Sequence, residues 1–208
     1  MTKWLIVRHG ATDWNQQHRI QGHSNISLNE EGREQARKLR RRLSKVKINA
    51  VYTSDLIRAS ETADILISNS ATVVRVFPNL REQTFGKWEG LKSDQIGAYI
   101  PALHGEISSK SSSTTPPQGE SLLEVRDRLA VAVSYFKKKH RTGCILIVAH
   151  GGSIGVLMTL LMDVSISGVG RFKTDNCSLS ILNVKDEKVD IELFNDISHL
   201  CDANLFCS

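Results

Sequence analysis

The chain has 208 residues, a length that suits one domain with a substantial core. Its composition, 40% hydrophobic and 24% charged, is that of an ordinary soluble protein. The net charge of +5 favours anionic substrates, but by itself it falls short of a nucleic-acid-binding signature.

Predicted strands and helices alternate along the chain. Apolar, β-branched runs predict strands at 3–9, 50–53, 73–77, 144–149, 177–184 and 188–194, the last two as a hairpin. Helices are expected from Asn29, from Ser54 or Asp55, from the capping box Ser121-x-x-Glu124, and over about 153–162. Residues 105–118, rich in Ser, Thr and Pro, predict a loop. This order predicts an α/β fold in which a mostly parallel central sheet carries helices on both faces, a three-layer α/β/α sandwich in one domain.

A cationic run at 37–47 is the strongest local charge in the chain. Ala36, Leu39, Leu43 and Val46 recur within it at helical spacing, which predicts the solvated face of an amphipathic helix. A patch for nucleic acid or another acidic partner is the alternative. We favour the first interpretation and expect no nucleic-acid partner.

The cysteines and the apolar stretches indicate the compartment. The four cysteines lack CxxC spacing, and Cys144 lies in an expected core strand, which argues against a zinc site and a disulfide framework. Cys201 and Cys207 could pair, but free thiols are favoured. The apolar stretch 145–162 is interrupted by His150 and glycines, so it predicts a buried strand and helix rather than a membrane span. With no targeting signal before the first strand, we expect a cytoplasmic protein without a membrane partner.

Two of the predicted strands end in a similar way. The first apolar run ends in Arg8-His9-Gly10, and the run at 144–149 ends in His150-Gly151-Gly152. Because ligands bind at the carboxyl edge of α/β sheets, two imidazoles are expected over one pocket. Arg58 offers a second guanidinium in the first turn of the next helix, although an ion pair with Glu61 or Asp55 is the alternative for it. Guanidinium forks and a helix N-terminus suit an anion such as phosphate.

At these residues the sequence resembles a known family. The run LIVRHGATDWN at 5–15 looks like the signature of the histidine phosphatase superfamily, also called phosphoglycerate mutase-like. The resemblance continues in order over nearly the whole chain, through 27–36, 54–63, 80–90, 117–121, 148–152 and 195–200. It implies the phosphoglycerate mutase-like fold, with one histidine phosphatase domain over 1–208 and a short excursion at about 86–118 over the active site.

The resemblance implies roles for five catalytic residues. His9 would be the nucleophile and form a phosphohistidine, while Arg8, Arg58 and His150 would hold the transferring phosphoryl group. Glu82 matches the proton donor, a choice that rests on the resemblance alone. For attack, His9 must be neutral, so its other ring nitrogen should donate to a backbone carbonyl. The assembly needs no metal and no cofactor, because phosphoryl transfer depends mainly on positioning and charge neutralisation.

Substrate contacts follow from the same resemblance. Asn15 would add a side-chain donor and Gly151 a backbone N–H, and Gln21-Gly22 matches a loop that lines the pocket in relatives. Among the remaining histidines, His199 is a candidate to reach the site from the tail. The others are expected at the surface, namely His18, His23, His104 and His140.

The expected function is a metal-independent phosphomonoesterase for small phosphorylated metabolites. A cofactor-dependent phosphoglycerate mutase is the first alternative, but the stretch between Glu82 and the Pro-x-Gly-Glu-Ser segment at 117–121 is short and has few basic groups to clamp a bisphosphate. A non-catalytic phosphate-binding or docking module is the second, and it should lack one of the five catalytic residues, all of which are present. The expected partner is a small phosphate ester; a homodimer and the substrate's identity stay open.

Overall fold

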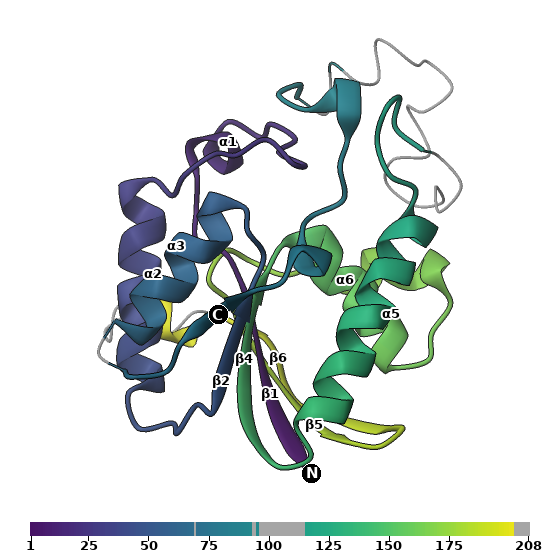
Figure 1. Cartoon of the computed structure of the whole chain (residues 1–208). Coiled ribbons are helices and arrows are strands. Elements are labelled where there is room, and N and C mark those ends of the chain that lie inside the picture. The colour runs from purple at the N-terminus through teal and green to yellow at the C-terminus, as the bar shows by residue number, and fades with distance from the viewer. Residues whose placement is uncertain (69, 93–94, 96–114, 202–208) are drawn as a thin grey trace.

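The computed structural model describes residues 1–68, 70–92, 95 and 115–201. A six-stranded sheet in the order β3-β2-β4-β1-β5-β6 forms its centre, with helices on both sides (Figure 1). The neighbours β3, β2, β4 and β1 are parallel, and β5 and β6 are added antiparallel at one edge. The predicted α/β/α arrangement with a mostly parallel sheet is confirmed.

The two central strands, β1 (Thr2–Arg8) and β4 (Gly143–Ala149), are covered on both faces. Side chains of a strand alternate between faces, so Trp4 and Ile6 join one hydrophobic cluster while Leu5 and Val7 join the other. Arg8 pairs with Ala149 in the parallel register. The residue that follows each strand therefore emerges beside its counterpart at the carboxyl edge of the sheet.

The outer strands are β2 (Ala50–Thr53), β3 (Val74–Val76), β5 (Leu179–Lys185) and β6 (Lys188–Asp196). β2 matches its predicted range, whereas the hairpin begins two residues later than expected. Cys177 has a positive φ of 54°, which interrupts extended backbone just before β5.

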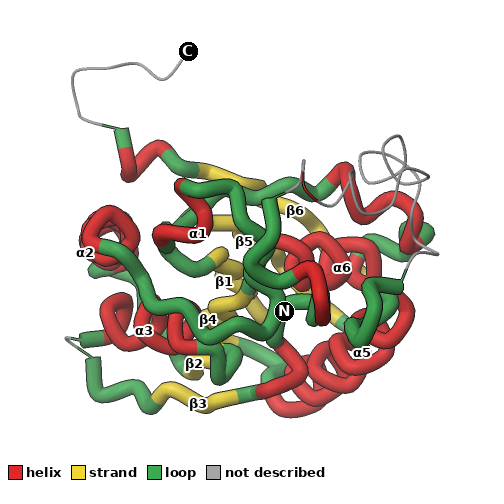
Figure 2. Tube along the Cα trace, turned by 90° about the horizontal axis from the view of Figure 1, so that it is seen from above, coloured by secondary structure: helices red, strands yellow, loops and turns green. Residues whose placement is uncertain are grey.

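In the described part of the chain, helices cover both faces of the sheet (Figure 2). α2 (Glu30–Leu43) and α3 (Ile57–Ile67) lie on one side, and α5 (Leu122–Lys139) and α6 (Gly151–Leu161) on the other. A short α1 (Asp13–Gln16) and several 3-10 turns lie in the connections. These turns span Pro78–Leu80, Gly86–Trp88, Ile166–Arg171 and Ser198–Leu200.

Helix starts follow the predicted caps in two cases and depart from them in two. Asn29 accepts a hydrogen bond from the Gly32 N–H, and Ser121 forms the predicted capping box with Glu124. The prediction that Ser54 or Asp55 caps α3 is wrong, because α3 begins at Ile57 without a side-chain cap. α6 begins directly after His150 rather than near residue 153.

The basic stretch at 37–47 is mostly the solvated side of α2. Ala36, Leu39 and Leu43 are buried as predicted, whereas Val46 lies beyond the helix end and is 39% exposed. Three of the cations pair with carboxylates of the same molecule: Arg37 and Arg41 with Glu34, and Arg42 with Asp196.

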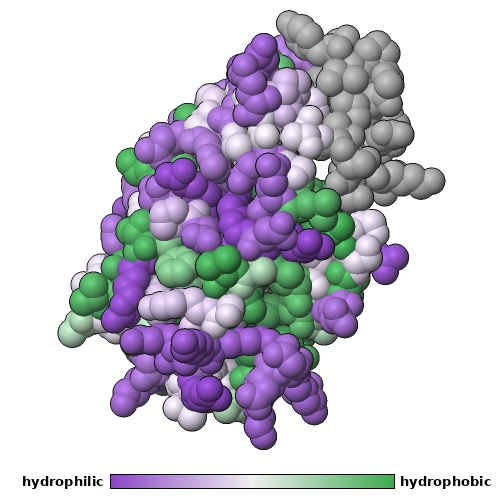
Figure 3. Space-filling model, turned by 45° about the vertical axis from the view of Figure 1, so that its right-hand side comes forward, coloured by the Kyte–Doolittle hydropathy of each residue, from purple (hydrophilic) through white to green (hydrophobic). Residues whose placement is uncertain are grey.

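Hydrophobic side chains also reach the surface. On α5, Leu123, Val131 and Tyr135 are exposed. On the face in Figure 3, hydrophilic residues lie above and below the hydrophobic groups. In the part of the chain that the structure describes, no helix combines the length and apolarity that crossing a bilayer requires.

Some predictions concern residues at or beyond the limits of the description. Cys144 and Cys177 are buried and free, but Cys201 is disulfide-bonded, so the expectation of a free thiol there is wrong. Cys207 lies outside the described residues, as does His104. The same holds for most of the predicted excursion at 86–118, namely 93–94 and 96–114.

Candidate active site

His9 follows β1 directly, and backbone groups fix its ring. The residue is 3% exposed, and Nδ1 lies 2.7 Å from the carbonyl oxygen of Gly10. A carbonyl oxygen only accepts, so Nδ1 donates its proton and the neutral ring keeps a lone pair on Nε2, as expected. Two residues steady this turn: Thr62 Oγ1 accepts from the Gly10 N–H at 3.1 Å, and Asn176 Nδ2 donates to the His9 carbonyl at 3.0 Å.

His150 follows β4 and lies beside His9. The two ring centroids are 5.1 Å apart, and His150 is fully buried. Ser54 Oγ lies 2.7 Å from His150 Nε2 and accepts a hydrogen bond from the Leu56 N–H, so its hydroxyl proton can be donated to Nε2. Nδ1 would then carry the ring proton, and it is buried without a partner among the described residues. A bound anion would satisfy this donor.

Arg58 and Arg8 bring two guanidinium groups to the same region. Arg58 is 1% exposed and donates to the carbonyls of Ser24 and Gly22 at 2.8 and 2.7 Å. Arg8 donates to the Thr174 carbonyl at 2.5 Å. Neither forms an ion pair within the described residues, and the Nε of each is buried without a partner there. Their positive charge is therefore available to an anionic ligand.

The alternative expected for Arg58, a surface ion pair, is excluded. Asp55 pairs with Arg81, and Glu61 pairs with Arg33. Both carboxylates proposed as partners are thus engaged elsewhere, while Arg58 points its charge toward the histidines.

The electrostatics keep both imidazoles neutral. Burial lowers the pKa of His9 well below 6.5, and the charges of Arg58 and Arg8 lower it further. The pKa of His150 is also well below 6.5, again from burial first and then from Arg58. Burial also lowers the pKa of Arg58, to about 10, so this guanidinium still carries its charge near neutral pH.

Glu82 lies at the N-terminus of α6. Its carboxylate accepts backbone hydrogen bonds from Gly152 at 2.9 Å and from Ser153 at 2.9 Å, and a third from Gln83 at 2.9 Å. These three N–H groups hold the carboxyl group of Glu82 where α6 meets the two histidines. Coulombic interactions of Glu82 with Arg8 and Arg58 place it in the same cluster.

Because Gly152 has no side chain, the carboxylate of Glu82 fits against it, and replacing Gly152 tests whether the position of Glu82 matters. A Cβ at position 152 would lie 2.5 Å from Glu82 Oε1. Because a carboxylate at the end of a flexible side chain can move, we expect Gly152→Ala to fold but to displace Glu82. If Glu82 is the proton donor that the family resemblance implies, kcat should fall about 10- to 100-fold. Gly170→Ala is the matched control, since no atom of the described residues lies within 4 Å of a Cβ there. Unchanged kcat in Gly152→Ala would contradict a role of Glu82 as proton donor.

The four predicted substrate contacts surround this cluster. Asn15 Oδ1 accepts from the backbone and hydroxyl of Thr12, and its Nδ2 forms no hydrogen bond with other described residues. Gly151 opens α6, and a Cβ there would lie 3.4 Å from Arg8 Cζ. Gly22 has a positive φ of 51° and holds Arg58 through its carbonyl. Gln21 is 9% exposed, with Oε1 buried and unpartnered in the described part.

Glu89 joins the Gly22 loop to the segment that carries Glu82. Its carboxylate accepts hydrogen bonds from the N–H groups of His23, Ser24 and Phe85. Burial alone would raise the pKa of Glu89, but these bonds outweigh it and lower the pKa. Glu89 therefore stays ionised and organises the loop whose carbonyls hold Arg58.

The histidines expected at the surface behave differently from one another. His18 is exposed as predicted. His23 is only partly exposed, and its Nε2 lies 2.8 Å from the carbonyl oxygen of Glu82. His140 is half-buried and bonded to the Tyr52 hydroxyl, and His199 contacts the Cys177 carbonyl behind the site.

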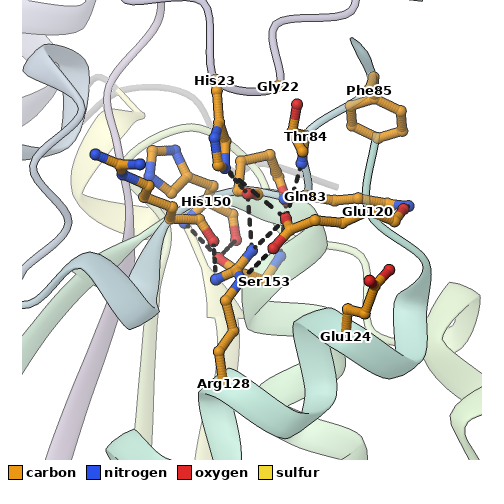
Figure 4. Close-up of polar contacts among 12 residues, drawn as sticks. Gly22, His23, Gln83, Thr84, Phe85, Glu120, Glu124, Arg128, His150 and Ser153 are labelled. Atoms are coloured by element: carbon orange, nitrogen blue, oxygen red, sulfur yellow. Dashed lines mark hydrogen bonds and ion pairs between the residues drawn. The ribbon is translucent and has the colours of Figure 1, made fainter. Parts of the chain in front are cut away.

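Several residues of the site were not predicted from the sequence. Ser54, Thr62 and Asn176 fix the two imidazoles, and Arg128 with Glu120 contacts the backbone around Glu82 (Figure 4). Ser54 and Thr62 lie within a segment that carries the family resemblance, which is the one signal that could have marked them. No group of three or more His, Cys, Asp or Glu side chains suited to a metal ion occurs among the residues described.

The comparisons with known proteins agree with this geometry. The histidine phosphatase superfamily (branch 1) matches residues 4–197. Phosphoglycerate mutase-like protein 4 of Arabidopsis thaliana is 36% identical over 200 residues, covering 94% of this chain and 86% of that protein. A metal-independent phosphoserine phosphatase of the same plant is 33% identical over 204 residues, covering 96% and 84%.

A solved structure gives the same result. A mycobacterial glucosyl-3-phosphoglycerate phosphatase in complex with VO3 superposes with a TM-score of 0.86 at 30% identity, covering 93% of this chain and 98% of that one. The chain belongs to the histidine phosphatase superfamily and is an enzyme of its phosphoric monoester hydrolase type.

Proposed function

We propose that this protein is a metal-independent phosphomonoesterase that hydrolyses small phosphorylated metabolites through a phosphohistidine on His9. One observation carries the proposal: His9 Nδ1 donates a hydrogen bond to the Gly10 carbonyl, so Nε2 keeps the free lone pair of this buried ring. The ring centroids of His9 and His150 are 5.1 Å apart. A neutral imidazole beside unpaired guanidinium groups is suited to attack an anionic phosphate ester.

The first step transfers the phosphoryl group to His9. A P–N bond forms at Nε2 while the ester P–O bond breaks, and Glu82 in its protonated form donates its proton to the leaving alkoxide. Arg8 and Arg58 neutralise the charge on the equatorial oxygens. The Nδ1–H of His150 would donate a hydrogen bond to one of the same oxygens.

The second step returns the enzyme to its starting state. Glu82, now a carboxylate, accepts a proton from water as the water oxygen attacks phosphorus and the P–N bond breaks. Inorganic phosphate leaves, and Glu82 regains the proton that it gave in the first step. We assign Asn15 Nδ2 and the Gly151 N–H to hold the phosphoryl group through both steps.

The role of Glu82 predicts a dependence on the leaving group. Glu82→Gln removes the proton donor, so kcat should fall about 100-fold or more on alkyl phosphates. p-Nitrophenolate leaves without protonation, so the loss on p-nitrophenyl phosphate should be much smaller. Steady-state kinetics on the two substrates measures the difference. Equal losses would remove Glu82 as the acid.

The proposed mechanism also predicts how inhibitors act. A chelator such as EDTA should leave activity unchanged, because the charge is neutralised by arginines rather than by a metal. Vanadate, which resembles five-coordinate phosphorus, should inhibit at low concentration. Initial rates with each compound test both expectations. An activity that requires an added divalent metal would contradict the mechanism.

The substrate is best sought among phosphorylated carboxylic acids. The names of two relatives point to phosphoserine and glucosyl-3-phosphoglycerate as their own substrates. A panel with these esters, 3-phosphoglycerate and sugar phosphates should include one preferred compound. Mutase activity is measured in the same assays, because one relative is a phosphoglycerate mutase-like protein and a mutase is the alternative function. Phosphoryl transfer to a second substrate hydroxyl in preference to water would favour the mutase.

A further inference from the structure

Arg128 on α5 binds the backbone that carries Glu82. Its Nη1 donates to the carbonyls of Asn79 and Arg81 at 2.8 and 2.7 Å, and its Nη2 donates to the carbonyl of Glu82 at 2.8 Å. Arg128 lies 46 positions after Glu82 in the chain, so this contact is tertiary. One guanidinium thus fixes three carbonyls of a segment that belongs to no strand.

Glu120 in turn fixes Arg128. Its carboxylate accepts from Arg128 Nε at 2.9 Å and from Nη2 at 3.0 Å, a two-point contact of the guanidinium fork. It also accepts from the Thr84 N–H at 3.0 Å, and its own carbonyl accepts from Gln83 Nε2 at 2.7 Å. Figure 4 shows these side chains converging below the Gly22 loop. The side chains of Arg128 and Glu120 are only 18% and 21% exposed.

Glu120 keeps its negative charge. Burial alone would raise the pKa of Glu120, but the hydrogen bonds from Arg128 and the Thr84 N–H outweigh it and lower the pKa. Because Glu120 stays ionised, the guanidinium keeps a fixed orientation. His23 Nε2, 2.8 Å from the Glu82 carbonyl, approaches the same oxygen from the loop side.

We propose that Arg128, oriented by Glu120, is a positioning residue that holds Glu82 in place for proton transfer. This inference rests on the proposed function of Glu82 as acid and base. Glu82 is held at two ends: Arg128 fixes its backbone carbonyl, and the Gly152 and Ser153 N–H groups fix its carboxylate. If the backbone end is released, the carboxylate loses its fixed distance to the leaving group.

The test compares two substrates in matched variants. Arg128→Met keeps the aliphatic stem and removes the fork. Arg126→Met on the same helix is the control, because among the described residues Arg126 pairs only with its exposed neighbour Asp127. We expect Arg128→Met to lower kcat on an alkyl phosphate about 10- to 100-fold, the effect of an acid displaced by about 1 Å. On p-nitrophenyl phosphate the loss should be several-fold smaller, and Arg126→Met should match the wild type on both.

A double variant separates positioning from general damage. If Arg128 acts through Glu82, Arg128→Met should cause no further loss on alkyl phosphates in a Glu82→Gln background. Equal losses on both substrates, or additive losses in the double variant, would overturn the inference. Circular dichroism and calorimetric binding of vanadate establish that each variant is folded and keeps its anion site.

The outcomes distinguish this inference from the proposed function. If Glu82→Gln is selective for leaving group and Arg128→Met is not, only the positioning role fails. If Glu82→Gln is not selective, the acid role fails and the positioning role fails with it. Should Arg128→Met not fold, Glu120→Gln replaces it, because it keeps the shape of the pair and removes the charge that orients Arg128; the same selective loss is expected.

Discussion

His9→Ala should abolish turnover of p-nitrophenyl phosphate, with a loss of at least about 10⁴-fold, while the fold is retained. The side chain supplies the only nitrogen to which the phosphoryl group is transferred in the proposed mechanism, and a methyl group cannot replace it. Within the described part of the chain its ring makes one hydrogen bond, to the Gly10 carbonyl, so folding depends little on it. Steady-state kinetics with thermal unfolding of the same sample measures both.

A control variant and detection of the phosphoenzyme show whether the loss of activity in His9→Ala is due to the missing nucleophile. His18 is exposed with a positive φ of 55°, a conformation that Asn tolerates, so His18→Asn should have wild-type activity. Rapid quenching of wild type with a ³²P-labelled substrate should trap an alkali-stable, acid-labile phosphoenzyme that His9→Ala lacks. Substantial activity in His9→Ala would refute the assignment of the nucleophile.

The sequence predicted the fold and the paired imidazoles because both depend on local patterns. Apolar runs that end in His9 and His150 mark buried strands, and parallel strands bring their carboxyl ends to one edge. The helix caps at Asn29 and Ser121 are equally local. Where two signals competed, as at Ser54, the tertiary contact prevailed: its hydroxyl bonds His150 and α3 begins without a side-chain cap.

The support of Glu82 could not be predicted in the same way. Glu82 was chosen by family resemblance, since several other carboxylates share its local surroundings in the sequence. Its carboxylate meets Ser153 across 71 positions, and its carbonyl meets Arg128 across 46. Arg128 belongs to a helix whose pattern predicts only which side chains are buried. Such contacts depend on how the layers pack, and no local periodicity encodes them.

The buried histidines also make the protein labile to acid. The pKa values of His9 and His150 are held well below 6.5 by burial and then by Arg58, whereas in the unfolded chain both histidines bind protons below about 6.5. Below that pH the unfolded state therefore binds more protons, so the free energy of unfolding decreases as the pH falls and is restored above it. If neither ring binds a proton in the native state down to pH 5.0, the two groups together lower the free energy of unfolding by at most about 4 kcal/mol between pH 7.5 and 5.0.

Urea unfolding in phosphate-free buffer across this range measures the loss. The pKa values of His140 and His199 are also lowered, mainly by burial, so they add to the loss. His150→Gln removes one contributing group, so it should lose less stability than wild type over this range, whereas the exposed control His18→Asn keeps all four of these histidines. The pKa values of Glu89 and Glu120 are lowered, so their stabilising contribution is lost only below the range in which unfolded glutamates titrate, about pH 4.3. The decline above pH 5 thus reports mainly on histidines. A free energy of unfolding that stays constant from pH 7.5 to 5.0 would show that the imidazoles accept protons in the native state, and the neutral nucleophile would then lose its electrostatic basis.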